Sequence, residues 1–491
     1  MSGWYAKWMT RWETELTTRD TNRVVRPLEW GFDWLADFDG GARAAVDGAE
    51  AGIAANQIGE SVDAGTKGRP QGRPQAEASG YEPRGLQEHH GTAEAVPLSK
   101  TVSTAVCEAL PLSGSGSSAS SAVSALAEEG GPGAGGGDAE RMIALNEEIV
   151  RRSVDFYGYT TPTDFRMEQR HPELFPTNVR PETLAQEAEM KRKAAAGELE
   201  PADFLRFTSA VRTGYAENDQ VNARWYPAPK EKQAGKPKQA IIVMPQWNAD
   251  AISHNVLCKL FNRFGVSALR LSKPYHDIRR PAELERSDYA VSANLGRTIV
   301  ACRQAVVDVR SCMDWLETQG YTEFGVLGTS LGSCYAFIAA AHDERLRVCA
   351  FNHASTWFGD VVWEGQSTRH VRAAFEEAGL TQDLVREMFL GISPMAYMDR
   401  FAATPKTGSP SRLAGWGRKR VLVVHAKYDL TFPPHHSLEV LENFDRRGVD
   451  FVSKVLPCGH YTTGEWPYKY LDGWYLGSFV YQAFKKLAER G

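Results

Sequence analysis

Three polar residues in the second half of the chain have the types and the order that nucleophilic catalysis requires. Ser330 lies between Gly328 and Gly332 in the sequence GTSLG, Asp429 follows the apolar run VLVVHAK, and His460 lies in LPCGHYTTGEWP. A serine hydroxyl is a weak nucleophile at neutral pH, so it needs an imidazole as its base, and the imidazole needs a carboxylate that fixes its tautomer. These residues could therefore form an acyl-transfer site.

Each of these assignments has an alternative that the residues alone leave open. A Gly-x-Ser-x-Gly match also arises when a structural serine lies in a glycine-rich turn, and Asp429 could cap a turn or helix. His425, His435 and His436 are other candidates for the base. We favour His460, because His425 lies within an apolar run typical of a buried strand and the other two fall in the expected first turn of a helix.

The elements expected around these residues place all three after strands. Short apolar runs that predict strands alternate with amphipathic helical stretches; these runs are KQAIIVMP, VSALRLS, FGVLG, RVCAFNHA, RVLVVHAK and FVSKVL. Such alternation predicts a parallel sheet covered by helices on both faces. FLRFTSAVRTGY and QVNARWYPA predict two further strands before this series. Ser330 then lies at a strand-to-helix turn, and open α/β sheets gather their sites at the carboxyl ends of strands.

The setting of Ser330 predicts a strained turn that exposes the hydroxyl. Residues as small as Gly328 and Gly332 allow the strand and the following helix to approach each other closely. The backbone N–H of Leu331 would then point at the oxygen that becomes negative during acyl transfer. We therefore expect Leu331 to supply one donor of an oxyanion hole.

From about residue 202 to the end, these motifs resemble the α/β-hydrolase superfamily, with Ser330, Asp429 and His460 on its triad positions. The resemblance implies a mostly parallel sheet of about eight strands, with helices on both faces and a helical cap inserted at about 355–416. It also implies a serine hydrolase that cleaves a carboxylic ester through an acyl-enzyme and needs no cofactor. A peptidase, thioesterase or acyltransferase of the same fold is the alternative, as is a non-catalytic scaffold.

The sequence departs from the superfamily after the strand KQAIIVMP. Many members have His-Gly there, followed by the second oxyanion donor, whereas this chain continues as PQWNAD. The second donor is then Trp247 or Asn248. We favour a backbone N–H over the Asn248 side chain.

The chain is expected to have four parts. Residues 1–38 predict an N-terminal helical segment in which Trp4, Trp8 and Trp12 share a face, residues 139–200 a second helical segment, and residues 201–491 the hydrolase domain. Residues 39–138 are rich in Gly, Ala and Ser and predict a disordered linker. We expect the tryptophan face to dock on the main domain. A membrane-surface role is the less favoured alternative, because the segment has about as many acidic as basic residues, whereas interfacial helices usually show a cationic face.

Composition and charge exclude several classes of partner and site. A net charge of −5 does not suit nucleic-acid binding, and no apolar stretch is long enough for a membrane span. The N-terminus does not resemble a secretory signal, so we expect a cytoplasmic protein. From the resemblance to hydrolases, we expect its substrate to be a small-molecule acyl ester. No zinc-ligand spacing occurs, so no metal site is expected. The cysteines are odd in number and predict buried thiols; they are Cys107, Cys258, Cys302, Cys312, Cys334, Cys349 and Cys458.

Overall fold

The computed structural model of the chain describes residues 2–38, 136–177, 181–403 and 418–489. Nearly all of the predicted linker, residues 39–138, lies outside these ranges, as does the last part of the predicted cap. The prediction for the linker therefore stays a prediction. Residues 136–138 belong to the first turn of a helix.

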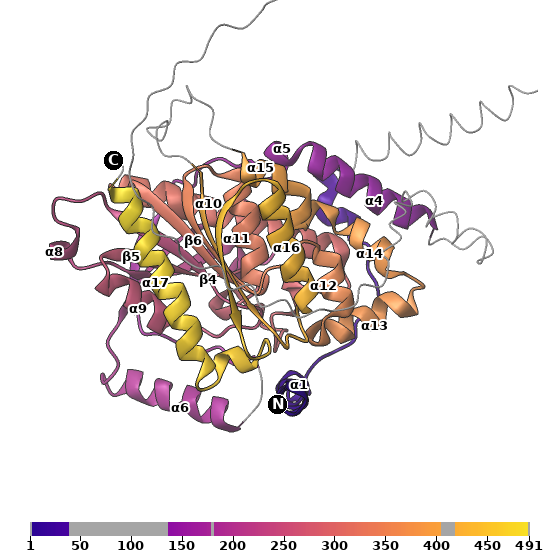
Figure 1. The fold of residues 1–491 in the computed structure, drawn as a ribbon, viewed down its shortest axis with the longest axis horizontal. Helices are drawn as coiled ribbons and strands as arrows, with labels where there is room; N and C mark the ends of the chain where they lie inside the picture. The colour runs from indigo at the N-terminus through magenta and orange to yellow at the C-terminus, as the bar shows by residue number, and fades with distance from the viewer. Residues whose placement is uncertain (1, 39–135, 178–180, 404–417, 490–491) are drawn as a thin grey trace, which may run out of the picture. The chain divides into compact units, whose positions relative to one another are not determined.

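The core of the fold is a nine-stranded sheet with the order β1-β2-β3-β5-β4-β6-β7-β8-β9 (Figure 1). The strands are β1 (Arg166–Arg170), β2 (Ala202–Thr208), β3 (Gln220–Tyr226), β4 (Gln239–Met244), β5 (Val266–Ser272), β6 (Glu323–Thr329), β7 (Leu346–Asn352), β8 (Arg420–Ala426) and β9 (Asp450–Leu456). The pairs from β5 to β9 are parallel, and β1, β2 and β3 extend the sheet by antiparallel pairing. The predicted mostly parallel α/β sheet is thus confirmed.

The additional strand lies in a segment for which the sequence predicted only helices. β1 pairs with β2 at the edge of the sheet, with Glu168 opposite Phe204. Its sequence, RMEQR, has no apolar alternation, because both faces of this strand are largely in contact with solvent. Charged residues are common on edge strands, where they discourage pairing with another chain. Hydrophobic periodicity therefore could not reveal this strand.

Helices cover both faces of the sheet, and alternate residues of each strand point to opposite sides. Ile241 and Val243 of β4 pack under α9 and α17, whereas Ile242 and Met244 pack on the side of α10, α11 and α16. These helices span Asn255–Arg263 (α9), Leu295–Thr318 (α10), Leu331–His342 (α11), Pro434–Arg446 (α16) and Tyr468–Ala488 (α17). Figure 1 shows α9 and α17 together on one side. Both layers bury apolar residues continuously, as a doubly covered parallel sheet requires.

A group of short helices follows β7 at the position predicted for the cap. The helices are α12 (Phe358–Glu364), α13 (Arg369–Glu377), α14 (Gln382–Met388) and α15 (Met398–Ala402). Several apolar side chains that could have lined a pocket are instead buried in the main core, namely Phe358, Phe375, Met388 and Phe389. Much of the apolar surface of these helices therefore belongs to the main core.

The N-terminal helix α1 (Ser2–Thr18) docks by a different face from the one that the tryptophan spacing suggested. Met9 and Glu13 are fully buried, whereas Trp4 is 75% exposed and Trp8 is 41% exposed. Trp12 is half-buried and contacts the ring of Tyr468 at 6.3 Å between centroids. Spacing alone cannot tell which face of a helix meets a neighbour.

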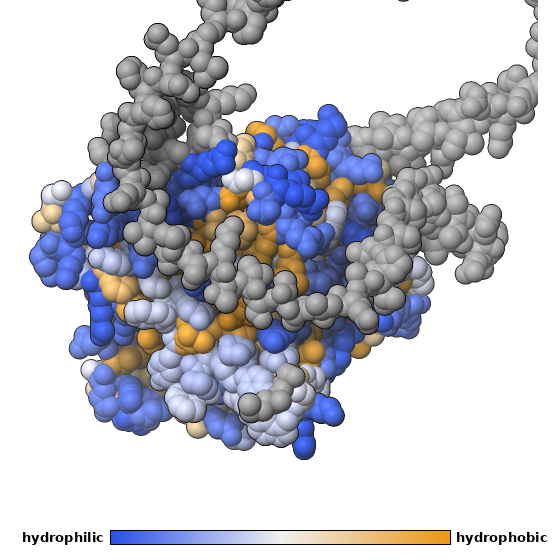
Figure 2. All heavy atoms as spheres, viewed as in Figure 1, coloured by the Kyte–Doolittle hydropathy of each residue, from blue (hydrophilic) through white to orange (hydrophobic). Residues whose placement is uncertain are grey.

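The remaining helices all precede β4 in the chain. They are α4 (Gly136–Arg151), α5 (Ser153–Phe156), α6 (Pro181–Ala195), α7 (Ala216–Asp219) and α8 (Lys230–Gln233). Within the ranges that the structure covers, none of the helices is long and apolar enough to cross a bilayer. Hydrophobic side chains gather in the middle of the face in Figure 2, with hydrophilic side chains around them. The six described cysteines are unpaired and buried, while Cys107 lies outside the described residues.

Candidate active site

Ser330 lies in a sharp turn between β6 and α11. Its φ of 56° and ψ of −122° are an unusual combination for a residue with a side chain, so the turn is strained. The flanking glycines are required by the close approach of the backbone. A Cβ on Gly328 would lie 2.1 Å from the carbonyl oxygen of Gly332, and a Cβ on Gly332 would lie 2.2 Å from that of Met244. The predicted elbow geometry is therefore present around Ser330.

The structure brings together Ser330, Asp429 and His460, which are far apart in the sequence. The Nε2 atom of His460 lies 2.9 Å from Oγ of Ser330, and its Nδ1 atom lies 2.8 Å from Oδ2 of Asp429. Because a carboxylate can only accept, Nδ1 carries the hydrogen and Nε2 is left to accept the serine proton. This arrangement can deprotonate Ser330 as its oxygen attacks a carbonyl carbon.

Local contacts hold Asp429 in the orientation that this chain of hydrogen bonds needs. Its Oδ1 atom accepts the backbone N–H groups of Thr431 at 2.8 Å and Phe432 at 2.7 Å. The side chain is almost completely buried, which alone would raise the pKa of Asp429, but the charges of His460 and His353 and their hydrogen bonds to the carboxylate lower it well below its usual range. Asp429 is therefore ionised at neutral pH.

The negative charge near His460 favours its protonated form. Burial alone would lower the pKa of His460, but the charge and hydrogen bond of Asp429, with a smaller contribution from Glu13, raise it above its usual value. A raised pKa stabilises the imidazolium that forms when Ser330 gives up its proton. The electrostatics of the site thus match a base that must hold a proton transiently.

A second histidine contacts the same carboxylate oxygen. Nδ1 of His353 lies 2.9 Å from Oδ2 of Asp429, and the rings of His353 and His460 are 4.3 Å apart between centroids. His353 is buried, and this burial, with the neighbouring His460, lowers its pKa, so it remains neutral and donates to Asp429. From the sequence, His353 could be placed only near the end of a strand, with either a structural or a pocket-lining role.

The other candidate bases lie elsewhere. His425 is buried within β8, and its pKa is lowered by burial. His435 and His436 lie in the first turn of α16, with their Nε2 atoms 3.0 and 3.3 Å from Oε2 of Glu364. None of these three histidines is hydrogen-bonded to Ser330 or Asp429 in the described chain, and the choice of His460 as the base stays a prediction.

Two groups in the described part of the chain offer three potential metal ligands within 4.8 Å of one another. One is His353, Asp429 and His460, and the other is Glu364, His435 and His436. In the first group the imidazoles are hydrogen-bonded to the carboxylate, so their positions are explained without a metal ion. The expectation of no metal site stays a prediction.

The two candidates for the second oxyanion donor differ in their hydrogen bonds. The backbone N–H of Asn248 donates to Nε2 of His276 at 3.1 Å, and its Oδ1 accepts the Ser287 N–H at 2.8 Å. The backbone N–H and the side-chain oxygen of Asn248 are thus both used in hydrogen bonds that form the turn, where its φ is 56°. Among the described residues, the backbone N–H of Trp247 meets no acceptor. Leu331 is the first residue of α11, where a backbone N–H has no partner within the helix.

His276 organises the turn that contains Trp247 and Asn248. Its Nδ1 atom lies 2.7 Å from the carbonyl oxygen of Pro274 and must donate to it, which leaves Nε2 free to accept the Asn248 N–H. Burial lowers the pKa of His276 far below its usual value and so keeps it neutral. The nearby Lys273 donates to the carbonyl oxygen of Gln246 at 2.8 Å. The sequence indicated no role for His276, because the contact joins two separate loops.

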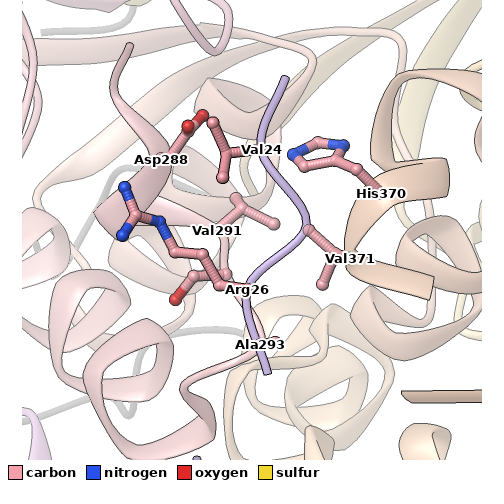
Figure 3. A pocket seen from close by; sticks show the side chains of 8 residues that line it. Val24, Arg26, Asp288, Val291, Ala293, His370 and Val371 are labelled. Atoms are coloured by element: carbon pink, nitrogen blue, oxygen red, sulfur yellow. The ribbon is translucent and has the colours of Figure 1, made fainter. Parts of the chain in front are cut away.

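A small pocket lies beside this turn, and the three triad residues are not among those that line it. Its lining residues are Val24, Arg26, Asp288, Val291, Ser292, Ala293, His370 and Val371. Figure 3 shows the chain at Val24 and Arg26 running between the side of Asp288 and Val291 and the side of His370 and Val371. His370 also stacks on the Trp247 ring, with 6.0 Å between centroids. The pocket is therefore linked to the site through Trp247.

Comparison with known proteins identifies related sequences and folds. Residues 250–400 match the protein family described as "Alpha/beta hydrolase domain containing 18". An Escherichia coli protein, described as an uncharacterized 31.7 kDa protein in the traX-finO intergenic region, is 32% identical over 94 residues. That alignment covers 18% of this chain and 32% of the relative, so the chain spans about a third of that protein's length.

Two solved structures illustrate the structural likeness. Acylaminoacyl peptidase from Pyrococcus horikoshii is 10% identical with a TM-score of 0.41, and the alignment covers 67% of this chain and 49% of that one. Acetyl xylan esterase 1 from a Thermoanaerobacterium species is 13% identical with a TM-score of 0.44, covering 68% of this chain and 93% of that one. The sheet order, the strained serine turn and the family match over residues 250–400 together show that the chain has the α/β-hydrolase fold.

Proposed function

We propose that this protein is a serine hydrolase that cleaves a carboxylic ester through an acyl-enzyme. The observation that carries the proposal is the continuous hydrogen-bonded series from Asp429 through His460 to Ser330, at 2.8 and 2.9 Å. A serine outside such a series has no base to accept its proton. The buried, ionised Asp429 and the raised pKa of His460 support the same conclusion.

The proposed reaction proceeds in two acyl-transfer steps. Oγ of Ser330 attacks the ester carbonyl while its proton moves to Nε2 of His460, and the backbone N–H groups of Leu331 and Trp247 stabilise the negative oxygen. His460 then gives this proton to the departing alcohol, leaving the acyl group on Ser330. A water molecule, deprotonated by His460, releases the acid and restores the serine.

The choice of an ester over an amide or thioester comes from the superfamily resemblance and not from a contact in the site. A small-molecule acyl ester and a cytoplasmic location likewise remain predictions from the sequence. A peptidase or acyltransferase would use the same three residues.

The proposal is tested by covalent labelling together with ester hydrolysis. A fluorophosphonate probe should label Ser330 of the wild-type protein, and S330A should lose both the label and the hydrolysis of p-nitrophenyl acyl esters. S437A is the matched control, because Ser437 is also buried but donates to the carbonyl oxygen of Ala354. It should keep both signals.

Each alternative function gives a different result in this experiment. Labelling of Ser330 without ester hydrolysis would favour the peptidase or acyltransferase reading. A correctly folded wild-type protein that reacts with neither reagent would contradict the proposal and favour a non-catalytic scaffold.

A further inference from the structure

The loop that carries His460 is held by a carboxylate from the other end of the chain. Glu13 of α1 is fully buried, and its Oε1 atom accepts the backbone N–H of Tyr461 at 2.8 Å. Its Oε2 atom accepts both the backbone N–H and the hydroxyl of Thr462, each at 3.0 Å. Glu13 thus receives three hydrogen bonds from the two residues that follow His460.

These bonds satisfy groups that the loop cannot satisfy by itself. Tyr461 and Thr462 lie at the start of the 3-10 turn Thr462–Gly464, where the first N–H groups have no partner within the turn. A capping residue usually supplies such an acceptor from the preceding turn of chain. Here the acceptor comes from α1 instead, and Glu13 therefore acts as a cap supplied from a distant segment.

The surroundings are shaped to admit this carboxylate. A Cβ on Gly459 would lie 2.4 Å from the carboxyl carbon of Glu13, so a larger residue beside His460 would push the carboxylate away. Further contacts fix α1 in place: Tyr5 donates to the carbonyl oxygen of Pro457, and Thr17 donates to Oε1 of Gln366 at 2.6 Å. The lack of a side chain at Gly459 thus leaves room for the Glu13 carboxylate, and the contacts of Tyr5 and Thr17 keep α1 in place beside the loop.

We infer that Glu13 is a positioning residue, which holds the loop Gly459–Thr462 so that His460 reaches both Ser330 and Asp429. The inference rests on the proposed function, since it assigns Glu13 a role in the same reaction. It makes α1 a part of the catalytic unit, whereas the sequence alone suggested only that this helix docks on the main domain.

The negative charge of Glu13 also affects the pKa of His460, which can be measured from the pH dependence of the reaction. The charged or titratable groups that face His460 in the described chain are Asp429 from the loop after β8, His353 at the end of β7 and Glu13 from α1, and Arg23 lies near the neighbouring Tyr461 hydroxyl. Glu13 raises the pKa of His460, although less than Asp429 does. Burial raises the pKa of Glu13 itself, and the N–H groups of Tyr461 and Thr462 oppose that shift.

The test compares E13Q with E13D in the full-length protein. E13Q removes the charge and turns one acceptor into a donor that faces an N–H group, so kcat should fall by about 10- to 100-fold, as small displacements of a catalytic group do. KM should change little, and the acid limb of kcat/KM should move to lower pH. E13D keeps the charge but is one methylene shorter, so kcat should fall while the acid limb stays near its wild-type position.

The matched control is E15Q, which makes the same chemical change on an exposed residue of the same helix. It should leave kcat within about twofold, in line with the small effects of exposed ion pairs. Thermal unfolding of all three variants separates a loss of folded protein from a loss of turnover. Unchanged kcat and pH profile in folded E13Q would overturn the inference.

Hydrogen exchange keeps the inference testable even if the proposed function fails. The amides of Tyr461 and Thr462 should exchange at least about tenfold faster in E13Q than in the wild type, and E15Q should not change them. If the wild type neither hydrolyses esters nor reacts with a fluorophosphonate, the proposed function is wrong. The holding of the loop by Glu13 is then decided by exchange alone, and equal exchange in E13Q and wild type would contradict it.

Discussion

The serine turn and the histidine loop differ in what holds them in place. Ser330 lies in a turn that two neighbouring glycines make possible, because Gly328 approaches Gly332 closely and Gly332 approaches the carbonyl oxygen of Met244 at the end of β4. His460 is held by partners that are distant in the sequence, namely Asp429 and, through the next two residues, Glu13. The glycines that allow the first arrangement lie in one short motif, whereas the residues that hold His460 come together only in the folded chain.

This difference has a consequence for how the two regions respond to mutation. A change in the serine turn should disturb the backbone itself, with a loss of both stability and activity. A change around the histidine loop should leave the sheet intact and act on the orientation and pKa of His460. The following predictions separate these two kinds of effect.

The largest effect is expected for D429N, in the histidine system. An amide would hold the wrong imidazole tautomer, so kcat should fall by about 10⁴-fold while the fold is kept. In the wild type, His460 must be neutral to accept a proton, and its pKa is raised by Asp429, so kcat/KM should rise with pH through a midpoint above about 6.5. In D429N the residual activity should have its midpoint at lower pH, because the charge that favours imidazolium is gone.

Rates across pH 5 to 9, measured with a non-titrating ester, decide this prediction. A loss of less than about tenfold would mean that another carboxylate serves His460.

The second-largest effect is expected for G332A, in the serine turn. In G332A the added methyl group would meet the carbonyl oxygen of Met244 at 2.2 Å, so the start of α11 must move away from the end of β4. Overpacking of this kind costs about 1–3 kcal/mol in free energy of unfolding, and kcat should fall by about 100-fold because the Leu331 N–H moves with the turn. Chemical denaturation and steady-state kinetics measure the two losses.

The matched control for this change is G473A in α17, where an added Cβ meets nothing within 4 Å. Alanine is the better helix former by up to about 1 kcal/mol, so this variant should be slightly more stable and fully active. A G332A protein with normal stability and activity would show that the turn does not need glycine.

A smaller effect is expected for H353N. Asparagine tolerates the φ of 57° at this position but cannot extend to Oδ2 of Asp429 as the imidazole does. The Oδ2 atom of Asp429 then bonds to His460 alone, so the pKa of His460 should rise further and the acid limb should move to higher pH. We expect kcat to fall by less than about tenfold.

The control is H342N. His342 is the last residue of α11, and its imidazole is buried and bonded to the carbonyl oxygen of Ile338. It should lower stability without moving the acid limb. An unshifted limb in H353N would show that His353 only fills space beside Asp429.

The smallest effects are expected for N248A and N248D. Because Oδ1 of Asn248 accepts the Ser287 N–H, alanine should lose about 1 kcal/mol of turn stability and aspartate should keep the bond. With a backbone N–H as the second oxyanion donor, both variants should keep kcat within about tenfold. A loss of 100-fold or more in both would instead place the side-chain amide of Asn248 in the oxyanion hole.

The sequence was sufficient for features that depend on neighbouring residues. Strand and helix periodicity predicted β2 to β9 and the helices α9, α10, α11 and α16 between them, and the glycines around Ser330 predicted the strained turn. The order of serine, acid and base selected the same three residues that the structure brings together. These features can be recognised in the sequence because they depend on local backbone geometry and on the alternation of side chains between the two faces of a sheet.

Only the tertiary structure decided the features that join distant segments. β1 has no apolar alternation, since it pairs at an exposed edge, and the buried face of α1 became known only through its neighbours. Glu13 and Thr462 are 449 positions apart, and their contact leaves no periodic signal. A hydrogen bond between loops depends on where the whole fold places them. The sequence therefore determined which residues could react, and the tertiary structure determined what holds them in position.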